Sequence, residues 1–285
     1  MRRGGAYPGA GRSRAIRAGS FLAGGLGAWA WFEAGWVRLE QRRLELSSLP
    51  PALDGLRIAH LSDFHLGVPS RGRAATERAV EWVEERRPDL VAVTGDLLTR
   101  SRGEPVLRSV MVRLAAVAPT FAILGNHDFA ISRDPLADRS PMQELSPAQL
   151  LSDEGVTIDV RGERVYIAGA DPRSRWSRSR KQPRDLASGD DASLRILLLH
   201  YPRVVDEVPT GAFDLVLAGH MHDGQINLPL PRGKVHLAHV GARFTRGVYR
   251  VPAGTMHVSA GLGTTFVPFR FAARPEATEL VLTRT

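Results

Sequence analysis

Five short polar motifs in this chain could together perform metal chemistry. In chain order they are Asp-x-His, Gly-Asp, Gly-Asn-His-Asp, a single His, and Gly-His-x-His. Their polar side chains belong to Asp63, His65, Asp96, Asn126, His127, His200, His220 and His222. Carboxylate, imidazole and amide oxygen groups are suitable ligands for manganese, iron or zinc. A carboxylate has two oxygens, so one Asp can bridge two ions. The motifs therefore indicate a centre for divalent metals.

The spacing within the motifs favours convergence. Asp63 and His65 are two residues apart, so their side chains point the same way if the chain is extended, and the same holds for His220 and His222. The glycines that precede Asp96, Asn126 and His220 allow tight turns and close backbone approach. The histidines outside the motifs are expected to be structural, and these are His60, His236, His239 and His257.

Each motif follows an apolar run of strand length. These runs cover residues 56–61, 90–93, 120–124, 194–199 and 215–218. Apolar residues at helical spacing occur over 76–87 and around 106–114, between the first three runs. Alternating strands and helices predict an α/β layer architecture. Because the carboxyl ends of neighbouring strands lie at one edge of a sheet, we expect the five motifs to meet there.

The second half of the chain has a different pattern. Residues 156–160 and 164–168 flank a polar turn and predict a β-hairpin. From residue 235 onward, short strand-like pieces alternate with Gly and Pro. We expect these pieces to form a second sheet that faces the first. Residues 41–55 are interpreted as a polar stretch.

Composition limits the possible chemistry and partners. The chain has 285 residues, 43% of them hydrophobic, which fits one large domain, and no cysteine, which excludes disulfides and thiolate sites. The net charge is +8, with arginines concentrated in residues 2–17 and 173–184. Such clusters attract anionic partners or form solvated loops. The second cluster contains one aromatic residue, Trp176, so no nucleic-acid partner is expected.

The N-terminal residues 1–45 predict a basic and apolar segment that associates with a membrane or acts as a signal. Residues 18–32 carry no charge, follow several arginines and end in an aromatic group that Trp36 extends. The run is shorter than the roughly 20 residues that span a bilayer. Spanning, interfacial binding, cleavage and a buried helix all stay open. We expect membrane association, with the side of the membrane undetermined.

The order of the motifs resembles the calcineurin-like metallophosphoesterase superfamily. The segments GHMHDGQINLP, the late GLG and the closing FRFAARPEATELVL resemble a bacterial branch of phosphodiesterases that often carries membrane or export segments. The resemblance covers residues 53–285. It implies an α/β fold, a sandwich of two facing mixed β-sheets flanked by helices.

The resemblance also implies roles for individual residues. Asp63, His65 and His222 would hold one ion, whereas Asn126, His200 and His220 would hold the other. Asp96 would bridge the two ions, His127 would assist the leaving group, and Arg100 would contact the substrate. Two positions depart from the pattern. Thr99 stands where the protein-phosphatase branch has Asp, and Asp223 stands where the related branch has Gly. The Asp223 carboxylate could hydrogen-bond a histidine ligand or be exposed, and we interpret it as exposed because it follows a loop ligand.

The implied reaction is hydrolysis of a phosphate ester or anhydride with two divalent ions. We expect a phosphodiester, or a lipid-linked or nucleotide pyrophosphate, among phosphorylated small molecules or lipid-linked substrates. Two alternatives stay open: a metal-binding interaction scaffold with weak catalysis, and a phosphodiesterase directed at nucleic acid. Degenerate scaffolds typically lack ligands, whereas every motif position is filled here.

Overall fold

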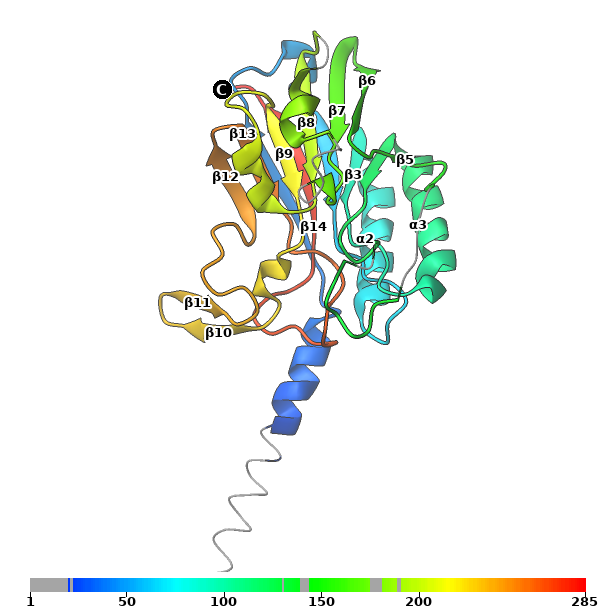
Figure 1. The fold of residues 1–285 in the computed structure, drawn as a ribbon, viewed down its shortest axis with the longest axis vertical. Coiled ribbons are helices and arrows are strands. Elements are labelled where there is room, and N and C mark those ends of the chain that lie inside the picture. Colours follow the sequence, from blue (N-terminus) through cyan, green and yellow to red (C-terminus); the bar gives the residue numbers. More distant parts are fainter. Residues whose placement is uncertain (1–19, 21–22, 130, 139–143, 175–180, 189–190) are drawn as a thin grey trace, which may run out of the picture.

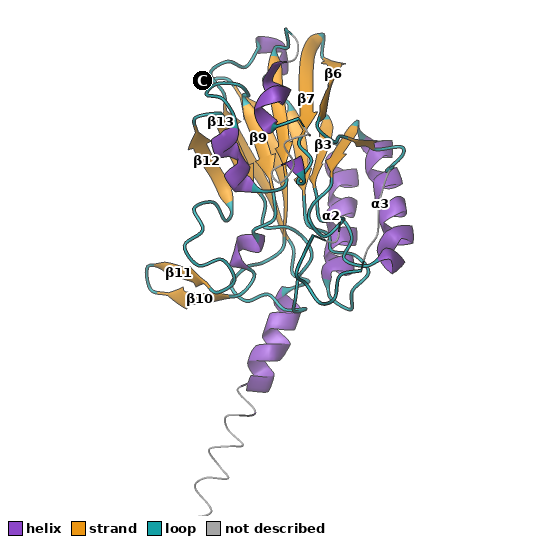
Figure 2. Cartoon of the chain, in the orientation of Figure 1, coloured by secondary structure: helices purple, strands orange, loops and turns teal. Residues whose placement is uncertain are grey.

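The computed structural model describes residues 20, 23–129, 131–138, 144–174, 181–188 and 191–285. Two six-stranded sheets face each other, and helices cover their outer faces (Figures 1 and 2). The predicted α/β sandwich of two mixed sheets is confirmed. The N-terminal arginines and much of the 173–184 cluster lie outside the described residues.

The first sheet holds the strands that precede the first three motifs. Its order is β1 (Arg38–Glu45), β14 (Glu276–Thr283), β2 (Arg57–Leu61), β3 (Leu90–Thr94), β4 (Thr120–Ile123) and β5 (Gln149–Leu150). From β2 to β5 the neighbours are parallel, whereas β14 runs antiparallel to β2. The motifs after β2, β3 and β4 therefore lie at the same sheet edge.

The second sheet holds the strands that precede the last two motifs. Its order is β12 (Gly247–Val251), β13 (Gly254–Val258), β9 (Leu215–Ala218), β8 (Leu194–Leu199), β7 (Glu163–Gly169) and β6 (Glu154–Val160). The predicted hairpin is formed by β6 and β7. A separate hairpin of β10 (Asn227–Leu230) and β11 (Gly233–His236) projects from the sandwich (Figure 1).

Two long helices cover the outer face of the first sheet. They are α2 (Gly72–Arg86) and α3 (Glu104–Val117). The side chains of α2 at positions 75, 79, 80 and 83 are buried on one face, which is the spacing of an amphipathic helix. Short 3-10 helices are η1 (Pro51–Leu53), η2 (Ser101–Gly103), η4 (Pro183–Ser188), η5 (Pro202–Glu207) and η6 (His222–Gly224).

The hydrophobic core has three layers. One lies between the two sheets and includes Ile58, Ile196 and Leu217. A second lies under α2 and α3, and a third covers the outer face of the second sheet. Both layers beside the first sheet contain β2 side chains, so β2 is packed on both faces and its carboxyl end is held firmly.

The N-terminal part of the chain joins the sandwich. Residues 38–45, which the sequence analysis placed in the N-terminal segment, form β1 and pair along their whole length with β14. Residues 23–33 form a helix that projects from the body (Figure 1). None of the described helices is long and apolar enough to cross a membrane.

Candidate metal centre

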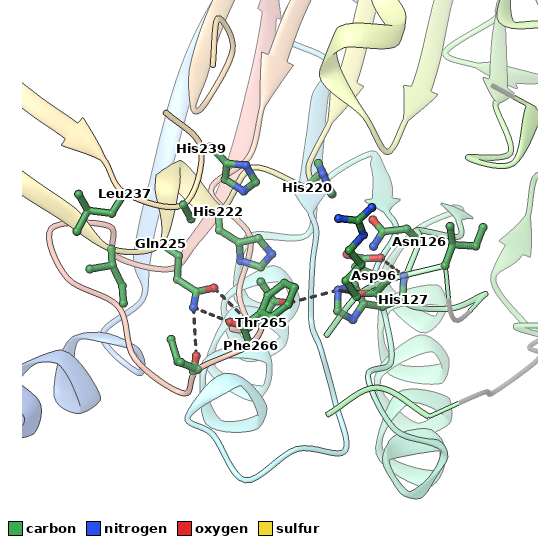
Figure 3. A pocket seen from close by; sticks show the side chains of 16 residues that line it. Asp96, Asn126, His127, His220, His222, Gln225, Leu237, His239, Thr265 and Phe266 are labelled. Carbon is green, nitrogen blue, oxygen red and sulfur yellow. Dashed lines mark hydrogen bonds between the residues drawn. The ribbon is translucent and has the colours of Figure 1, made fainter. Parts of the chain in front are cut away.

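The five motifs meet at one edge of the sandwich. Asp63 follows β2, Asp96 follows β3, Asn126 follows β4, His200 follows β8 and His220 follows β9. Both sheets therefore contribute to the same site, and Figure 3 shows several of these side chains around one cavity. The described residues include three groups of acidic and histidine side chains whose ligand atoms lie within 4.8 Å of one another.

The first group consists of Asp63, His65 and His222. The Nε2 atoms of His65 and His222 are 3.1 Å apart, and Asp63 Oδ1 is 3.5 Å from His222 Nε2. Zinc–nitrogen bonds are about 2.0–2.1 Å, so two nitrogens on one tetrahedral ion lie roughly 3.3 Å apart. The separation of the two imidazoles thus fits a shared divalent ion.

The second group combines Asn126, His200 and His220. His200 Nε2 is 3.0 Å from Asn126 Oδ1 and 3.2 Å from His220 Nδ1. An amide oxygen and two imidazole nitrogens face one another at the spacing of ligands to a single ion. The donor set suits the same borderline metals as the first group.

Asp96 lies between the two groups. Its Oδ2 is 3.5 Å from His65 Nε2 and 3.3 Å from His200 Nε2. Its Oδ1 accepts a hydrogen bond of 2.9 Å from the backbone N–H of His127. One oxygen of this carboxylate therefore faces both groups, and the other oxygen is held by the protein. This is the position that a bridging ligand requires.

The backbone at the ligands is not extended, so the extended-chain argument from two-residue spacing was wrong. Five ligand residues have positive φ, with values of 53° at Asp63, 47° at His65, 52° at Asp96, 72° at His220 and 48° at His222. Non-glycine residues seldom adopt this region, and it is concentrated at functional sites. As a result His220 faces His200, whereas His222 faces His65.

Glycine is required where the strand-end turns pack together. A Cβ on Gly95, whose φ is +90°, would lie 2.7 Å from the backbone nitrogen of Gly125 and 2.8 Å from His200 Nδ1. A Cβ on Gly219 would lie 2.5 Å from Asp63 Oδ2. The close approach expected from these glycines is confirmed, because any side chain here would push the candidate ligands apart.

Protein groups fix the other nitrogen of two candidate histidine ligands, His65 and His200. His65 Nδ1 is 2.9 Å from Thr99 Oγ1, and His200 Nδ1 is 2.9 Å from the carbonyl of Thr94. Contacts of this kind set the orientation of a ligating imidazole. Thr99, the residue that replaces Asp of the phosphatase pattern, thus supports His65.

Arg270 was missed by the sequence analysis. It is fully buried, its Nη2 is 3.0 Å from His222 Nδ1, and its guanidinium donates to the carbonyls of Gly263 and Ala273. It ties the loop before β14 to the metal centre. A single arginine inside the apolar FRFAA stretch was the available signal.

Asp128, the last residue of the Gly-Asn-His-Asp motif, has a structural role that the sequence did not predict. Its buried carboxylate accepts hydrogen bonds from the backbone N–H groups of Leu97, Leu98 and Gly125 at 2.8–3.0 Å. Burial raises the pKa of Asp128 to about 7, and the nearby Asp96 carboxylate adds to this shift. Asp128 therefore joins the turns that carry Asp96 and Asn126.

His127 is oriented by hydroxyl groups. Its Nε2 lies 2.8 Å from Ser132 Oγ and 3.3 Å from Thr265 Oγ1. Its Nδ1 is buried and has no hydrogen-bond partner. His127, His65 and Asp96 also form one of the three groups with close ligand atoms. Among the described residues, no group pairs with this imidazole nitrogen beside the metal centre.

A cavity of about 550 Å³ opens beside both groups (Figure 3). Its polar lining includes His127, Arg133 and His239. Its apolar wall consists of Ile131, Ile226, Leu237, Ala238, Phe266 and Val267. His239, which was expected to be structural, is therefore exposed to the cavity, and its ring centroid is 6.0 Å from that of His220.

Arg100 is placed elsewhere. It does not line the cavity, and its Nε donates a hydrogen bond of 2.6 Å to the carbonyl of Leu136. Asp223, interpreted as exposed, is only 5% exposed and forms an ion pair with Lys234. This correction follows from the fold of the β10–β11 hairpin, which brings Lys234 back over Asp223.

The protonation of the metal-free centre leads to a first prediction. Burial lowers the pKa of His65 and His222 and lowers that of His220 to about 3, so these rings are neutral. Burial opposes the charge of His200 too, but the carboxylates of Asp96 and Asp63 outweigh it and raise its pKa to about 9. At pH 7.5 His200 is therefore protonated without metal and must lose that proton to bind one.

We expect zinc or manganese loading of the metal-free protein at pH 7.5 to release about one proton per chain from His200. Isothermal titration calorimetry in buffers of different ionisation enthalpy measures this release. Raising the pH well above 9 should remove the part of the release that comes from His200, because this imidazole is then mostly neutral. Loading at pH 7.5 without proton release would contradict the prediction.

Comparison with known proteins identifies the family. Residues 56–224, which contain all five motifs, match the model of the calcineurin-like phosphoesterases. This family depends on two metal ions, in agreement with the two groups of candidate ligands.

Several known proteins are similar to this chain over most of its length. YkoQ of Bacillus subtilis, an uncharacterized metallophosphoesterase, is 29% identical over 80% of this chain and 84% of its own. The phosphodiesterase YaeI of Escherichia coli is 27% identical over 90% and 93%. A transmembrane protein with a metallophosphoesterase domain from Danio rerio is 34% identical over 84% of this chain and 56% of its own. The strand-end ligand groups and the matched residues together place the chain in the calcineurin-like phosphoesterase family, as a hydrolase that acts on phosphoric ester bonds.

Proposed function

We propose that the chain hydrolyses a phosphodiester or pyrophosphate bond in a substrate that has both a phosphate and an apolar part. One divalent ion would be held by Asp63, His65 and His222, the other by Asn126, His200 and His220. The observation that carries the proposal is the position of Asp96, whose single Oδ2 atom faces both groups. Manganese, iron and zinc all suit this donor set.

When bound, two such ions would polarise the phosphoryl group and lower the pKa of the attacking water toward neutrality. The protein's own contribution is to orient the side chains that would bind these ions. Thr99, Thr94 and Arg270 fix the imidazoles of His65, His200 and His222. These supports hold the ligands before substrate arrives, which reduces reorganisation during the reaction.

His127 is the proposed group for the leaving oxygen. Its buried Nδ1 has no partner, and its Nε2 is held by Ser132. A hydroxyl can serve as donor or acceptor, so Ser132 supports either protonation state of the ring. His127 can therefore donate a proton or a hydrogen bond to the leaving oxygen.

The cavity supports the substrate class. Six apolar side chains form one wall, whereas Arg133 is the cavity's one Arg or Lys among the described residues. An apolar wall favours a substrate with a hydrocarbon or aromatic substituent, and a single arginine suits one further phosphate oxygen. The name of the similar protein YaeI, a phosphodiesterase, also agrees with a diester.

The direct test is hydrolysis of a panel of phosphomonoesters, chromogenic phosphodiesters and lipid-linked pyrophosphates with manganese, iron or zinc. We expect diesters or pyrophosphates with apolar substituents to give the highest kcat/KM. Treatment with a chelator should abolish turnover, and added metal should restore it. Turnover that survives complete metal removal would refute the two-metal proposal.

Replacing Arg133 with Ala is expected to raise KM by about three- to tenfold with little change in kcat. The exposed guanidinium contacts a phosphate oxygen equally in the ground and transition states, so its loss weakens binding alone. Steady-state kinetics on a phosphodiester measure the change. Arg100→Ala is the matched control and should leave KM unchanged, because Arg100 is bonded to Leu136. The reverse pattern would restore Arg100 as the substrate contact.

A further inference from the structure

Two apolar segments contribute to the cavity lining, and a third, the N-terminal helix, packs against one of them. They are residues 23–36, 226–243 and 264–269, and we call them together the apolar rim. Nearly all large hydrophobic side chains exposed in the described residues belong to it, namely Leu26, Trp29, Trp31, Phe32, Trp36, Leu228, Leu230, Val235, Leu237, Val240, Phe266 and Val267. The others are Ile131, which lines the cavity, and Val112 and Val248, on α3 and β12. So much exposed apolar surface at one end marks an interaction site.

The helix of the apolar rim is fixed to the cavity wall. The carbonyl of Ala30 accepts a hydrogen bond of 3.0 Å from Arg270 N, and Glu33 Oε1 accepts one of 2.8 Å from Ala273 N. Trp31 packs edge-on against Phe269 with ring centroids 6.3 Å apart. The loop that these contacts hold also supplies Phe266 and Val267 to the cavity. A partner that binds the helix would therefore lie close to the loop that lines the cavity.

The β10–β11 hairpin is fixed to the same loop. Gln225 Nε2 donates to the carbonyls of Thr265 and Val267 at 2.8 and 3.1 Å, and Gln225 Oε1 accepts from Thr265 N at 2.9 Å. Helix and hairpin project from the same end of the molecule, away from the C-terminus (Figure 1). The apolar rim is thus one unit beside the cavity.

The charge of the apolar rim favours an anionic partner. The three segments of the apolar rim contain one acidic residue, Glu33. Its side chain is 4% exposed and is hydrogen-bonded to Trp29 and Ala273. The cations of the apolar rim are Arg232 at the hairpin tip, Lys234, which pairs with Asp223, and Arg243, which pairs with Asp206. Basic residues beside apolar side chains are the composition that binds anionic lipid.

The shape of the apolar rim favours a bilayer. Trp31 packs against Phe269, whereas Trp29 and Phe32 contact each other, and all three side chains are at least 38% exposed. A protein groove covers one stripe of a helix, whereas lipid surrounds it. Trp29, Phe32 and Trp36 form an aromatic cluster with centroids 5.7–6.2 Å apart. Tryptophan is enriched at the level of lipid headgroups.

We propose that the apolar rim docks on the surface of a bilayer that contains anionic lipid, so that the cavity faces the membrane and takes an amphiphilic phosphate substrate from it. The substrate part of this inference rests on the proposed function. The docking part does not, because it depends on exposed side chains outside the metal centre.

Single cysteines test the docking directly, because the chain has no cysteine of its own. In the full chain, Leu230→Cys on the hairpin and the control Val112→Cys on α3 would each carry a nitrobenzoxadiazole label. Vesicles of phosphatidylglycerol and phosphatidylcholine with a spin-labelled lipid quencher provide the membrane. We expect a blue shift and at least about twofold quenching at position 230, and neither change at position 112.

Ala28→Cys on the helix separates docking from simple tethering. Quenching at 28 without quenching at 230 would mean that the helix alone holds the chain, which would overturn the proposal. A blue shift at 230 without lipid, together with a dimer in sedimentation, would assign the rim to a second copy and overturn it too. Vesicles of phosphatidylcholine alone should bind at least about tenfold more weakly.

A double variant of the hairpin tests membrane docking separately from hydrolysis of the substrate. Leu228→Ser/Leu230→Ser should lower vesicle affinity by at least about tenfold and leave hydrolysis of a soluble phosphodiester unchanged, since neither residue lines the cavity. The rate at which this variant hydrolyses a substrate embedded in vesicles should fall in parallel with its affinity for the vesicles. Val112→Ser/Val248→Ser is the matched control. Absence of soluble hydrolysis in the unmodified chain would refute the proposed function, whereas equal vesicle affinity of both double variants would refute the docking.

Discussion

Asp96→Asn is expected to empty both metal positions and to lower kcat on a phosphodiester by at least about a thousandfold. The substitution preserves shape, and the remaining amide oxygen can still accept from His127 N. It removes the negative charge from the one oxygen that faces both ligand groups. A neutral group between two cations cannot offset their repulsion, so neither ion is held tightly. Metal content after gel filtration and steady-state kinetics measure the two effects.

The number of ions retained by the Asp96→Asn variant should be compared with the number retained by Asn126→Ala. Asn126 faces only the second group, through the 3.0 Å contact of its Oδ1 with His200 Nε2. Its loss should therefore remove one ion and leave the first group loaded. Asp89→Asn is the control for loss of a carboxylate, because Asp89 pairs with Arg161 away from the site. An Asp96→Asn enzyme with two ions and full rate would disprove the bridging role.

The strands and their motifs could be predicted because local pattern and tertiary position agree. The strands ending at Leu61, Thr94 and Ala218 are rich in apolar residues and almost wholly buried, as strands packed on both faces must be. Their carboxyl ends converge by the geometry of parallel sheets. The candidate ligands at those ends needed no information beyond residue type and order.

The elements that escaped prediction depend on distant contacts. β1 contains mostly charged residues, and its pairing partner β14 lies more than 200 residues later in the chain. An edge strand of this kind has no apolar signal of its own. The burial of Asp223 likewise depends on Lys234, which returns through a hairpin.

Arg100, which was predicted to contact the substrate, does not line the cavity, whereas Arg133 does. Arg100 follows the Gly-Asp motif closely in sequence, but its side chain turns toward the carbonyl of Leu136. Arg133 lies in an irregular segment whose path no periodic pattern encodes, and that segment carries it to the cavity. Loop conformation, set by bonds such as that of Asp134 Oδ2 with Phe266 N at 2.8 Å, decides which arginine is available.

His127→Ala is expected to retain both metal ions and to lower kcat by about 10²- to 10⁴-fold. The reason is that His127 belongs to neither of the two proposed ligand groups. The two ligand groups are complete without His127, whose Nε2 is bonded to Ser132 and whose Nδ1 is free. Metal content therefore tests its role before any rate is measured. Loss of an ion would mean that the group of His65, Asp96 and His127 binds metal and that the assignment to the leaving group is wrong.

The size of the rate loss should depend on the leaving group. A nitrophenolate leaves without help from an acid, whereas an alkoxide needs a proton, so His127→Ala should slow an alkyl diester at least about tenfold more than a nitrophenyl diester. Ser132→Ala retains the His127 imidazole but removes the hydroxyl that orients it. This variant should also slow the alkyl diester more than the nitrophenyl diester, but by a smaller factor than His127→Ala. If His127 only stabilised the phosphoryl oxygens, both diesters would slow equally. A plot of log kcat against leaving-group pKa for the two variants distinguishes these cases, since only loss of a proton donor steepens its slope.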